Sequence, residues 1–224
     1  MIEVVFRGVL APLVRWGYRP EVRGLSNMPA EGPVILAANH RAEVDTGVIA
    51  VVVRRQVRFL GKAEYFNRPG PLGRLTARTL DGLGYVPVER GNARAGLAAL
   101  DAGRAVLGAG GVFALYPEGT RSRDGRLHRG HTGVASLALS TGAKVIPVAL
   151  SGTERVLPPG ARVPRWTKIG VTFGEPLDFS RYGGQESSPF IRRSVTDEIM
   201  YALMELTGLE YVDQYHKRPD QNAA

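Results

Sequence analysis

Short apolar runs alternate with helix-like segments along most of this chain, and that alternation limits the folds open to it. Six runs are rich in β-branched or aromatic residues and have the length of buried strands: residues 34–38, 57–60, 85–88, 112–116, 145–150 and 168–173. Strands that alternate with helices typically build one sheet with helices packed on its faces. The sequence therefore predicts an α/β fold.

Three segments carry the periodicity and end signals of helices. Residues 92–107 begin at a capping residue, Asn92, and residues 132–140 end before a glycine. A third helix is expected to begin after Ser188 and to end before Gly208. These positions predict where the helices that cover the sheet begin and end.

The domain organisation follows from length and composition. The chain has 224 residues, 44% of them hydrophobic, and no polar stretch divides it into two. The composition of residues 48–53 favours a strand, whereas a helix would suit their position directly after residues 39–45. The sequence turns polar after Tyr215. We expect a single domain over residues 21–215 and a disordered tail over residues 216–224.

Composition also narrows the chemistry. The absence of cysteine excludes disulfides, thiolate metal ligands and a cysteine nucleophile, and we expect no metal. A formal charge of +8 favours acidic partners such as anionic lipid headgroups, phosphorylated substrates or nucleic acid. No base-stacking motif or zinc spacing supports nucleic acid, so we expect no nucleic-acid partner.

A histidine and a carboxylate stand five residues apart in residues 39–45 (NHRAEVD), directly after an apolar run. At about 100° per residue, His40 and Asp45 would point about 140° apart on a uniform helix. They can meet if His40 lies in the turn after the strand and Asp45 lies in the first turn of the next helix. That arrangement would place the imidazole at the exposed end of a strand, a usual position for chemistry in α/β folds.

Such a pair can activate a hydroxyl. A neutral imidazole, with an ordinary pKa of about 6.5, accepts a proton near neutral pH, and a carboxylate on its other nitrogen fixes the tautomer and stabilises the imidazolium. The chain offers no obvious serine for His40 to activate, which indicates that the hydroxyl belongs to a substrate. In the competing interpretation, His40 is a turn residue and Asp45 a helix cap, without chemistry.

Residues 116–122 (YPEGTRS) follow another strand and form a turn rich in anion-binding groups. Arg121 can hold a phosphate with a bidentate fork, and Glu118 is assigned the role of orienting arginines. Other basic residues come from neighbouring loops: Lys62, Arg90, Arg123, Arg126, His128 and Arg129. The alternative is a solvated basic loop, which we favour for Arg123 and Arg126.

In order along the chain, residues 39–45, 84–90 (GYVPVER), 116–122 and 145–148 (VIPV) resemble the four sequence blocks of the glycerolipid acyltransferase family. The likeness spans residues 33–177. It implies a single α/β domain with a mixed central sheet flanked by helices, similar to glycerolphosphate acyltransferases. It also implies transfer of an acyl group from acyl-CoA or acyl carrier protein to the hydroxyl of a lysophosphatidic acid-type acceptor in phospholipid biosynthesis.

The resemblance also implies a role for each site residue. His40 would be the general base and Asp45 its orienting partner, with no cofactor besides the thioester co-substrate. The residues implied to bind substrate are Asn39, Lys62, Arg90, Glu118, Gly119, Thr120, Arg121 and Arg129. Two alternatives stay open: a different lysophospholipid or glycolipid acceptor, and a non-catalytic protein of the same fold that binds anionic lipid.

A protein that acts on lipids must reach a membrane surface. Residues 2–18 are too short and too often interrupted by charge for a membrane span or a signal peptide. With Leu13, Trp16 and flanking arginines, residues 1–20 are instead expected to form an amphipathic segment that lies on an anionic membrane. The alternative is that this segment only packs on the domain. We expect a peripheral protein on the cytoplasmic face, with the basic loop over residues 155–168 as a second contact.

Overall fold

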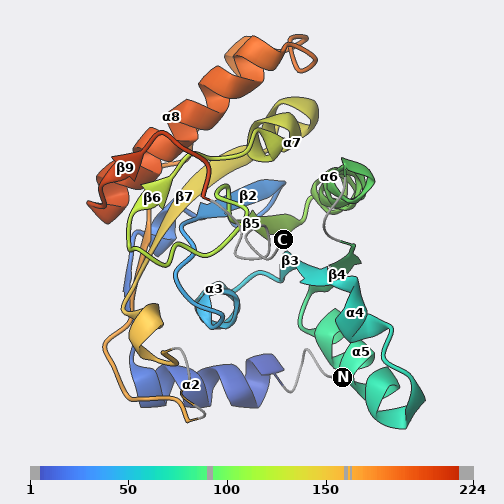
Figure 1. Cartoon of the computed structure of the whole chain (residues 1–224), viewed down its shortest axis with the longest axis vertical. Coiled ribbons are helices and arrows are strands. Elements are labelled where there is room, and N and C mark those ends of the chain that lie inside the picture. The colour runs from blue at the N-terminus through green and yellow to red at the C-terminus, as the bar shows by residue number, and fades with distance from the viewer. Residues whose placement is uncertain (1–5, 90–92, 159–160, 162, 217–224) are drawn as a thin grey trace, which may run out of the picture.

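A mixed seven-stranded sheet organises the chain in the computed structural model, which describes residues 6–89, 93–158, 161 and 163–216 (Figure 1). Its strands lie in the order β1-β8-β7-β2-β5-β3-β4. Neighbouring strands run parallel except β7 and β8, which are antiparallel. The bounds are β1 Glu21–Arg23, β2 Val34–Ala38, β3 Val57–Lys62, β4 Tyr85–Val88, β5 Val112–Leu115, β7 Lys144–Ser151 and β8 Gly170–Phe173. The predicted α/β fold with a mixed sheet is confirmed.

Helices cover both faces of this sheet. Their bounds are α2 Ala11–Tyr18, α3 Asp45–Val52, α4 Ala63–Phe66, α5 Gly70–Gly82, α6 Ala93–Gly108, α7 Gly133–Thr141 and α8 Pro189–Thr207. A π-helical turn, Phe6–Leu10, precedes α2, and 3₁₀ turns lie at Leu25–Asn27, Thr153–Arg155 and Ser180–Tyr182. Two short strands, β6 Leu127–His128 and β9 Tyr211–Val212, pair in parallel beside the main sheet.

The central strand β2 divides the core into two layers. All five of its residues are buried, and alternate side chains enter opposite clusters. Leu36 packs on one face with Ile49 of α3, whereas Ile35 packs on the other with Leu137 of α7 and Leu203 of α8. Figure 1 shows α3 on one side of the sheet and α7 and α8 on the other.

The predicted ends of two helices are confirmed. The Ser188 hydroxyl accepts a hydrogen bond from the Ile191 N–H at 3.4 Å and caps α8. Gly142 and Gly208 follow α7 and α8 in the left-handed conformation, with φ of 63° and 65°. The third helix is present as α6, but its predicted cap, Asn92, lies outside the described residues.

The ambiguous segment after the His/Asp pair is a helix. Helix α3 continues to Val52, and only Val53 is extended. The branched side chains of this segment favour a strand by propensity, but Ile49, Val51 and Val52 are buried. Tertiary packing therefore decides the structure here, and it places Asp45 in a first helical turn.

The N-terminal segment is helical and is attached to α3. The Arg15 guanidinium donates to the backbone oxygen of Val51 at 2.8 Å and to that of Val52 at 3.4 Å, so it caps the carbonyl end of α3. The outer side chains Leu13 and Trp16 remain 58% and 73% exposed. Within the described residues, the helices are all too short or too polar to cross a membrane.

Candidate active site

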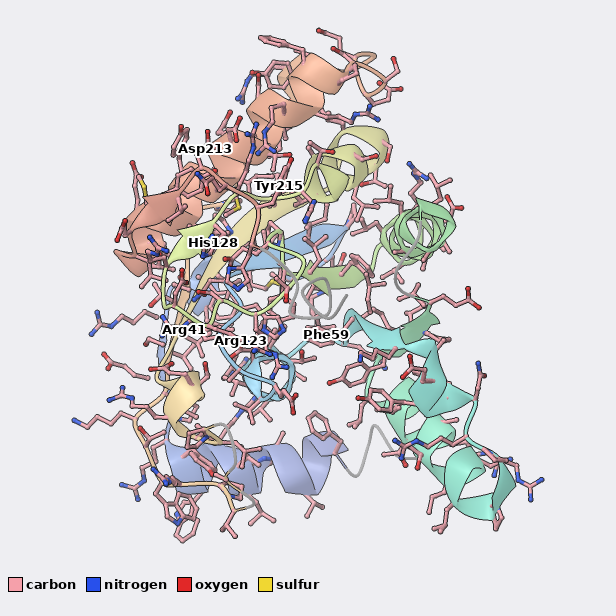
Figure 2. The ribbon with its side chains drawn as sticks, in the orientation of Figure 1. Arg41, Phe59, Arg123, His128, Asp213 and Tyr215 are labelled. Atoms are coloured by element: carbon pink, nitrogen blue, oxygen red, sulfur yellow. The ribbon has the colours of Figure 1, made fainter. Side chains whose placement is uncertain are left out.

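The two motifs meet at one edge of the sheet. Strands β2 and β5 are parallel neighbours, so the residues after their carboxyl ends, His40 and the turn at 116–122, lie side by side. The Ser122 N–H donates to the His40 backbone oxygen at 2.8 Å and joins the two loops directly. Figure 2 shows Arg41 and Arg123 on the loops of this region and His128 on β6.

His40 and Asp45 form the predicted pair. His40 Nδ1 lies 2.8 Å from Asp45 Oδ2. The same carboxylate oxygen accepts the backbone N–H of Arg41 at 2.7 Å and that of Ala42 at 2.8 Å. Asp45 is fully buried, whereas the His40 side chain is 18% exposed. A turn followed by a first helical turn therefore brings the two residues together, as the sequence predicts.

This geometry suits proton transfer. The bond at Nδ1 leaves Nε2 as the nitrogen that can take a proton from a bound hydroxyl. A buried carboxylate on Nδ1 favours the tautomer with its proton there and stabilises the imidazolium that forms. Three donors converge on one oxygen and keep the carboxylate aimed at the ring.

Tyr116 covers the face of the His40 ring, a contact that no sequence motif predicts. The ring centroids are 3.8 Å apart and the planes are inclined by 11°. The Tyr116 hydroxyl lies 2.9 Å from Thr46 Oγ1, in the first turn of α3. Burial raises the pKa of the Tyr116 hydroxyl well above its ordinary value of 10, so the hydroxyl stays protonated near neutral pH.

The turn at 116–122 depends on Gly119. Its φ is +71°, a left-handed conformation that glycine adopts without steric cost, and its N–H donates to the Tyr116 backbone oxygen at 2.9 Å. A Cβ there would lie 2.9 Å from Cδ2 of His131. Gly119 is exposed, and Thr120 and Arg121 are partly exposed. Their roles in binding substrate stay predictions.

The role assigned to Glu118 is corrected. Both oxygens of this buried carboxylate accept backbone N–H groups, one from His40 at 3.4 Å and one from His128 at 2.9 Å. These bonds tie the loop that carries His40 to β6, and within the described residues the carboxylate orients backbone N–H groups instead of arginines. Burial raises the pKa of Glu118 to about 7, opposed by these two hydrogen bonds.

Stability should therefore fall as Glu118 ionises. Its pKa is about 7 in the folded protein against an ordinary 4.5, so the folded state holds the proton more tightly and loses stability as pH rises across that range. The loss is on the order of 3 kcal/mol. We expect Glu118→Gln to remove most of this pH dependence, measured by urea unfolding at about pH 5 and about pH 8. Equal pH dependence in both proteins would contradict this.

Asn39 is also placed differently from the expectation that it contacts substrate. The residue is 1% exposed. Its Oδ1 accepts the Leu150 N–H at 2.7 Å, and its Nδ2 donates to the Leu150 backbone oxygen at 3.0 Å. Buried amides are stable when paired in this way. Asn39 joins the ends of β2 and β7 and fixes the start of the His40 turn.

The basic residues predicted to bind substrate are not all gathered at the site. Arg121 forms an exposed ion pair with Glu43 at 2.9 Å. Arg129 Nε lies 3.5 Å from Asp213 Oδ1, and its Cζ lies 5.4 Å from the Tyr215 ring centroid. Arg129 therefore contacts residues 213–215 near the C-terminus. Lys62 is exposed at the end of β3. Arg90 lies outside the described residues.

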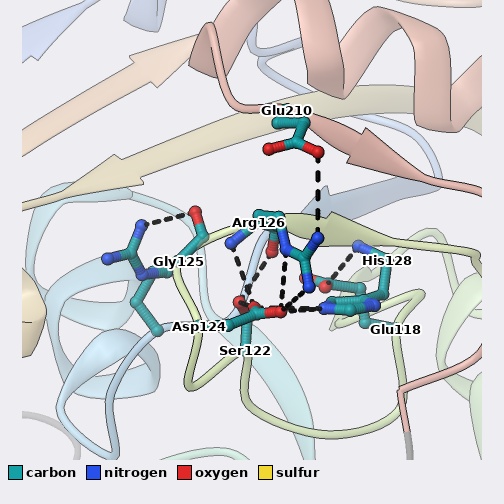
Figure 3. A network of polar contacts seen from close by, with 8 residues as sticks. Glu118, Ser122, Asp124, Gly125, Arg126, His128 and Glu210 are labelled. Atoms are coloured by element: carbon teal, nitrogen blue, oxygen red, sulfur yellow. Dashed lines mark hydrogen bonds and ion pairs between the residues drawn. The ribbon is translucent and has the colours of Figure 1, made fainter.

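A polar network holds the loop after the turn, and sequence analysis missed it (Figure 3). Asp124 accepts from Arg126 Nε at 3.0 Å and from the Ser122 hydroxyl at 3.1 Å, and it lies 3.0 Å from His128 Nε2. Asp124, His128 and His216 carry donor atoms within 4.8 Å of one another, a spacing that a metal can bridge. Because Arg126 already neutralises Asp124, an ion-pair network accounts for these contacts.

The fold and site define an α/β protein with a histidine–aspartate base beside a glycine-containing turn, suited to activating a substrate hydroxyl. The chain belongs to the acyltransferase family, whose family model, described as "Acyltransferase", matches residues 19–151. That range contains His40, Asp45 and the turn at 116–122. The family predicted from the sequence blocks is thus confirmed.

The chain is also similar to individual proteins, some of which are named as acyltransferases. A chloroplastic 1-acyl-sn-glycerol-3-phosphate acyltransferase of Arabidopsis thaliana is 29% identical over 64% of this chain, which spans about two fifths of that relative's length (39%). An uncharacterized protein of Mycobacterium tuberculosis is 25% identical over 85% of this chain and 62% of its own length. The crystal structure of the 1-acyl-sn-glycerophosphate acyltransferase PlsC from Thermotoga maritima matches with a TM-score of 0.58 and 26% identity. That match covers 89% of this chain and 80% of the solved chain.

Proposed function

We propose that this chain transfers a fatty acyl group from a thioester to the hydroxyl of a lysophosphatidic acid-type acceptor in phospholipid synthesis. The contact between His40 and Asp45 at 2.8 Å carries the proposal, because it supplies a base for a substrate hydroxyl. Family membership and relatives named as 1-acylglycerol-3-phosphate acyltransferases support the acceptor class. The donor is the thioester of coenzyme A or of acyl carrier protein.

In the proposed reaction, His40 Nε2 takes the proton of the acceptor hydroxyl as the hydroxyl oxygen attacks the thioester carbonyl carbon. Asp45 stabilises the imidazolium at Nδ1. The tetrahedral intermediate collapses, the carbon–sulfur bond breaks, and the imidazolium returns its proton to the thiolate. An ester and a free thiol result, with no acyl-enzyme. The exposed turn at residues 119–121 is proposed to hold the acceptor phosphate.

A panel of acyl-CoA and acyl carrier protein thioesters with several lyso-acceptors tests this function. Thiol release and product mass are read in the same reaction. We expect diacylglycerol phosphate with lysophosphatidic acid. Product only from a different lysophospholipid or a glycolipid would correct the acceptor. Binding to anionic vesicles with no product from any pair would instead support a non-catalytic lipid-binding protein.

We further propose that the N-terminal helix α2 docks the protein peripherally on an anionic membrane, at the cytoplasmic face. The side chains of Leu13 and Trp16 are exposed on this helix. Trp166, 75% exposed on the second candidate loop, lies with its ring 4.7 Å from that of Tyr18 at the end of α2. The two segments expected to contact a membrane therefore lie together.

Replacing Leu13 and Trp16 with serine should weaken membrane binding. Because each buries a large apolar surface on docking, we expect the partition coefficient onto anionic vesicles to fall about tenfold or more. Vesicle co-sedimentation measures it. Leu97→Ser is the matched control, since Leu97 is 61% exposed on the distant helix α6 (Figure 1). An equal loss in both variants would contradict docking through α2.

A further inference from the structure

The imidazole of His40 is held from two directions. Asp45 meets the ring at Nδ1, and Tyr116 meets it face to face, with 3.8 Å between the ring centroids. Glu118 accepts a hydrogen bond from the backbone N–H of His40 and does not hold the imidazole. The aromatic contact follows from topology, because Tyr116 comes directly after β5 and His40 comes shortly after the parallel neighbour β2.

Tyr116 is itself anchored beside the other partner of His40. Its hydroxyl lies 2.9 Å from Thr46 Oγ1, and Thr46 follows Asp45 in the first turn of α3. The hydroxyl remains protonated near neutral pH, so this hydrogen bond persists under working conditions. One helical turn therefore fixes both the carboxylate at the edge of the imidazole and the ring on its face.

We propose that Tyr116 is a positioning residue for His40, which holds the imidazole in line with Asp45 and stabilises its protonated form. This inference rests on the proposed acyl transfer. The second side-chain torsion of histidine is soft, so a hydrogen bond at Nδ1 leaves the ring free to tilt, and a stacked ring restrains it. An aromatic face also attracts a cation, which favours the imidazolium that forms as the acceptor loses its proton.

A purely structural role makes a different prediction. If Tyr116 only fills space, another apolar side chain of similar size would serve as well, and its loss would lower stability without changing the chemistry of His40. In our proposal the stacked ring of Tyr116 holds the imidazole, and the hydrogen bond from its hydroxyl to Thr46 contributes less. Tyr116→Phe keeps the ring and loses the bond to Thr46, and Tyr116→Leu loses both, so the two variants separate the possibilities.

We expect Tyr116→Leu to lower kcat about tenfold with little change in KM, because the ring acts on the base and not on substrate binding. The acid limb of the kcat/KM profile should move to lower pH by about half a unit, since a less stable imidazolium loses its proton more readily. Tyr116→Phe should keep the wild-type pH profile and most of kcat. A Tyr116→Leu variant with wild-type kcat and pH profile would overturn the proposal.

Phe113→Leu is the matched control. Phe113 lies on β5, the strand that Tyr116 follows, is fully buried and packs in the opposite core cluster, so its loss should lower stability without moving the acid limb. NMR of the His40 ring protons gives a readout independent of turnover. Stacking should hold them upfield in wild type and Tyr116→Phe but not in Tyr116→Leu.

The two proposals can fail separately. If wild type gives no product with any donor and acceptor, the proposed function fails, and the NMR comparison still decides whether Tyr116 holds the imidazole. An unchanged His40 ring-proton shift in Tyr116→Leu would overturn the positioning role whatever the activity.

Discussion

Replacing His40 with alanine should lower kcat for acyl transfer between about a hundredfold and about ten-thousandfold, the usual contribution of a positioned general base. The side chain is partly exposed at the end of β2 and bonds Asp45 at 2.8 Å, so its removal takes away the proton acceptor. Thiol release from the acyl donor, followed continuously with lysophosphatidic acid as acceptor, measures the loss.

Folding and membrane binding serve as controls for His40→Ala. The variant should keep its far-ultraviolet circular dichroism and bind anionic vesicles like wild type, because α2 contacts the carboxyl end of α3 through Arg15, whereas His40 contacts Asp45 at the start of α3. Added imidazole should restore part of the rate by entering the vacated space. Wild-type turnover in His40→Ala would show that this histidine is a turn residue without chemistry.

Asp45→Asn should lower kcat about a hundredfold to a thousandfold. One carboxylate oxygen accepts all three bonds, from His40, Arg41 and Ala42, and an amide oxygen can accept the same three. The histidine tautomer is therefore kept, and the loss reports the missing negative charge beside the imidazolium. Steady-state kinetics with saturating donor measures it.

Asp45→Ala is the companion to this variant. It loses all three hydrogen bonds at a fully buried position and should lower the free energy of unfolding by about 3 kcal/mol or more. Asp45→Asn should lose less, about 1–3 kcal/mol, because its Nδ2 replaces Oδ1, which has no partner in the described structure. Wild-type kcat in Asp45→Asn would contradict a role for the carboxylate in proton transfer.

Much of the fold follows from local sequence signals. Residues 34–38, 85–88 and 189–207 match their elements because apolar runs and caps are encoded locally. Strand β1, with three residues, is too short to give a pattern. In helix α5, Leu72 and Leu75 are exposed and stand among glycines and arginines. The apolar residues of α5 therefore do not form a stripe that predicts a helix packed on the core.

The candidate site was predicted in part. Spacing and turn logic placed His40 and Asp45, because both belong to one strand–turn–helix unit. The contacts of Asn39, Glu118 and Tyr116 join segments about 75 to 110 residues apart, and only the order of strands in the sheet brings them together. The contact between His40 and Asp45 is therefore predictable from local sequence, whereas the contacts of Asn39 and Glu118 depend on the fold of the whole sheet.

The domain bounds expected at residues 21–215 stay predictions. The helical turns at residues 6–18 lie outside that range and yet bond α3 through Arg15. Of the tail expected over residues 216–224, only His216 is described, and its ring centroid lies 4.3 Å from that of His128.

A single-turnover reaction with isotope-labelled acyl thioester and lysophosphatidic acid tests direct transfer through His40. The protein is in excess over the labelled thioester, and the reaction is quenched at successive times. Free thiol, labelled diacyl product and the intact mass of the protein are measured in each sample. We expect thiol and diacyl product to appear at equal rates and in equal amounts, only when the acceptor is present, with no labelled protein. Thiol release without the diacyl product, or label on the protein, would contradict this mechanism.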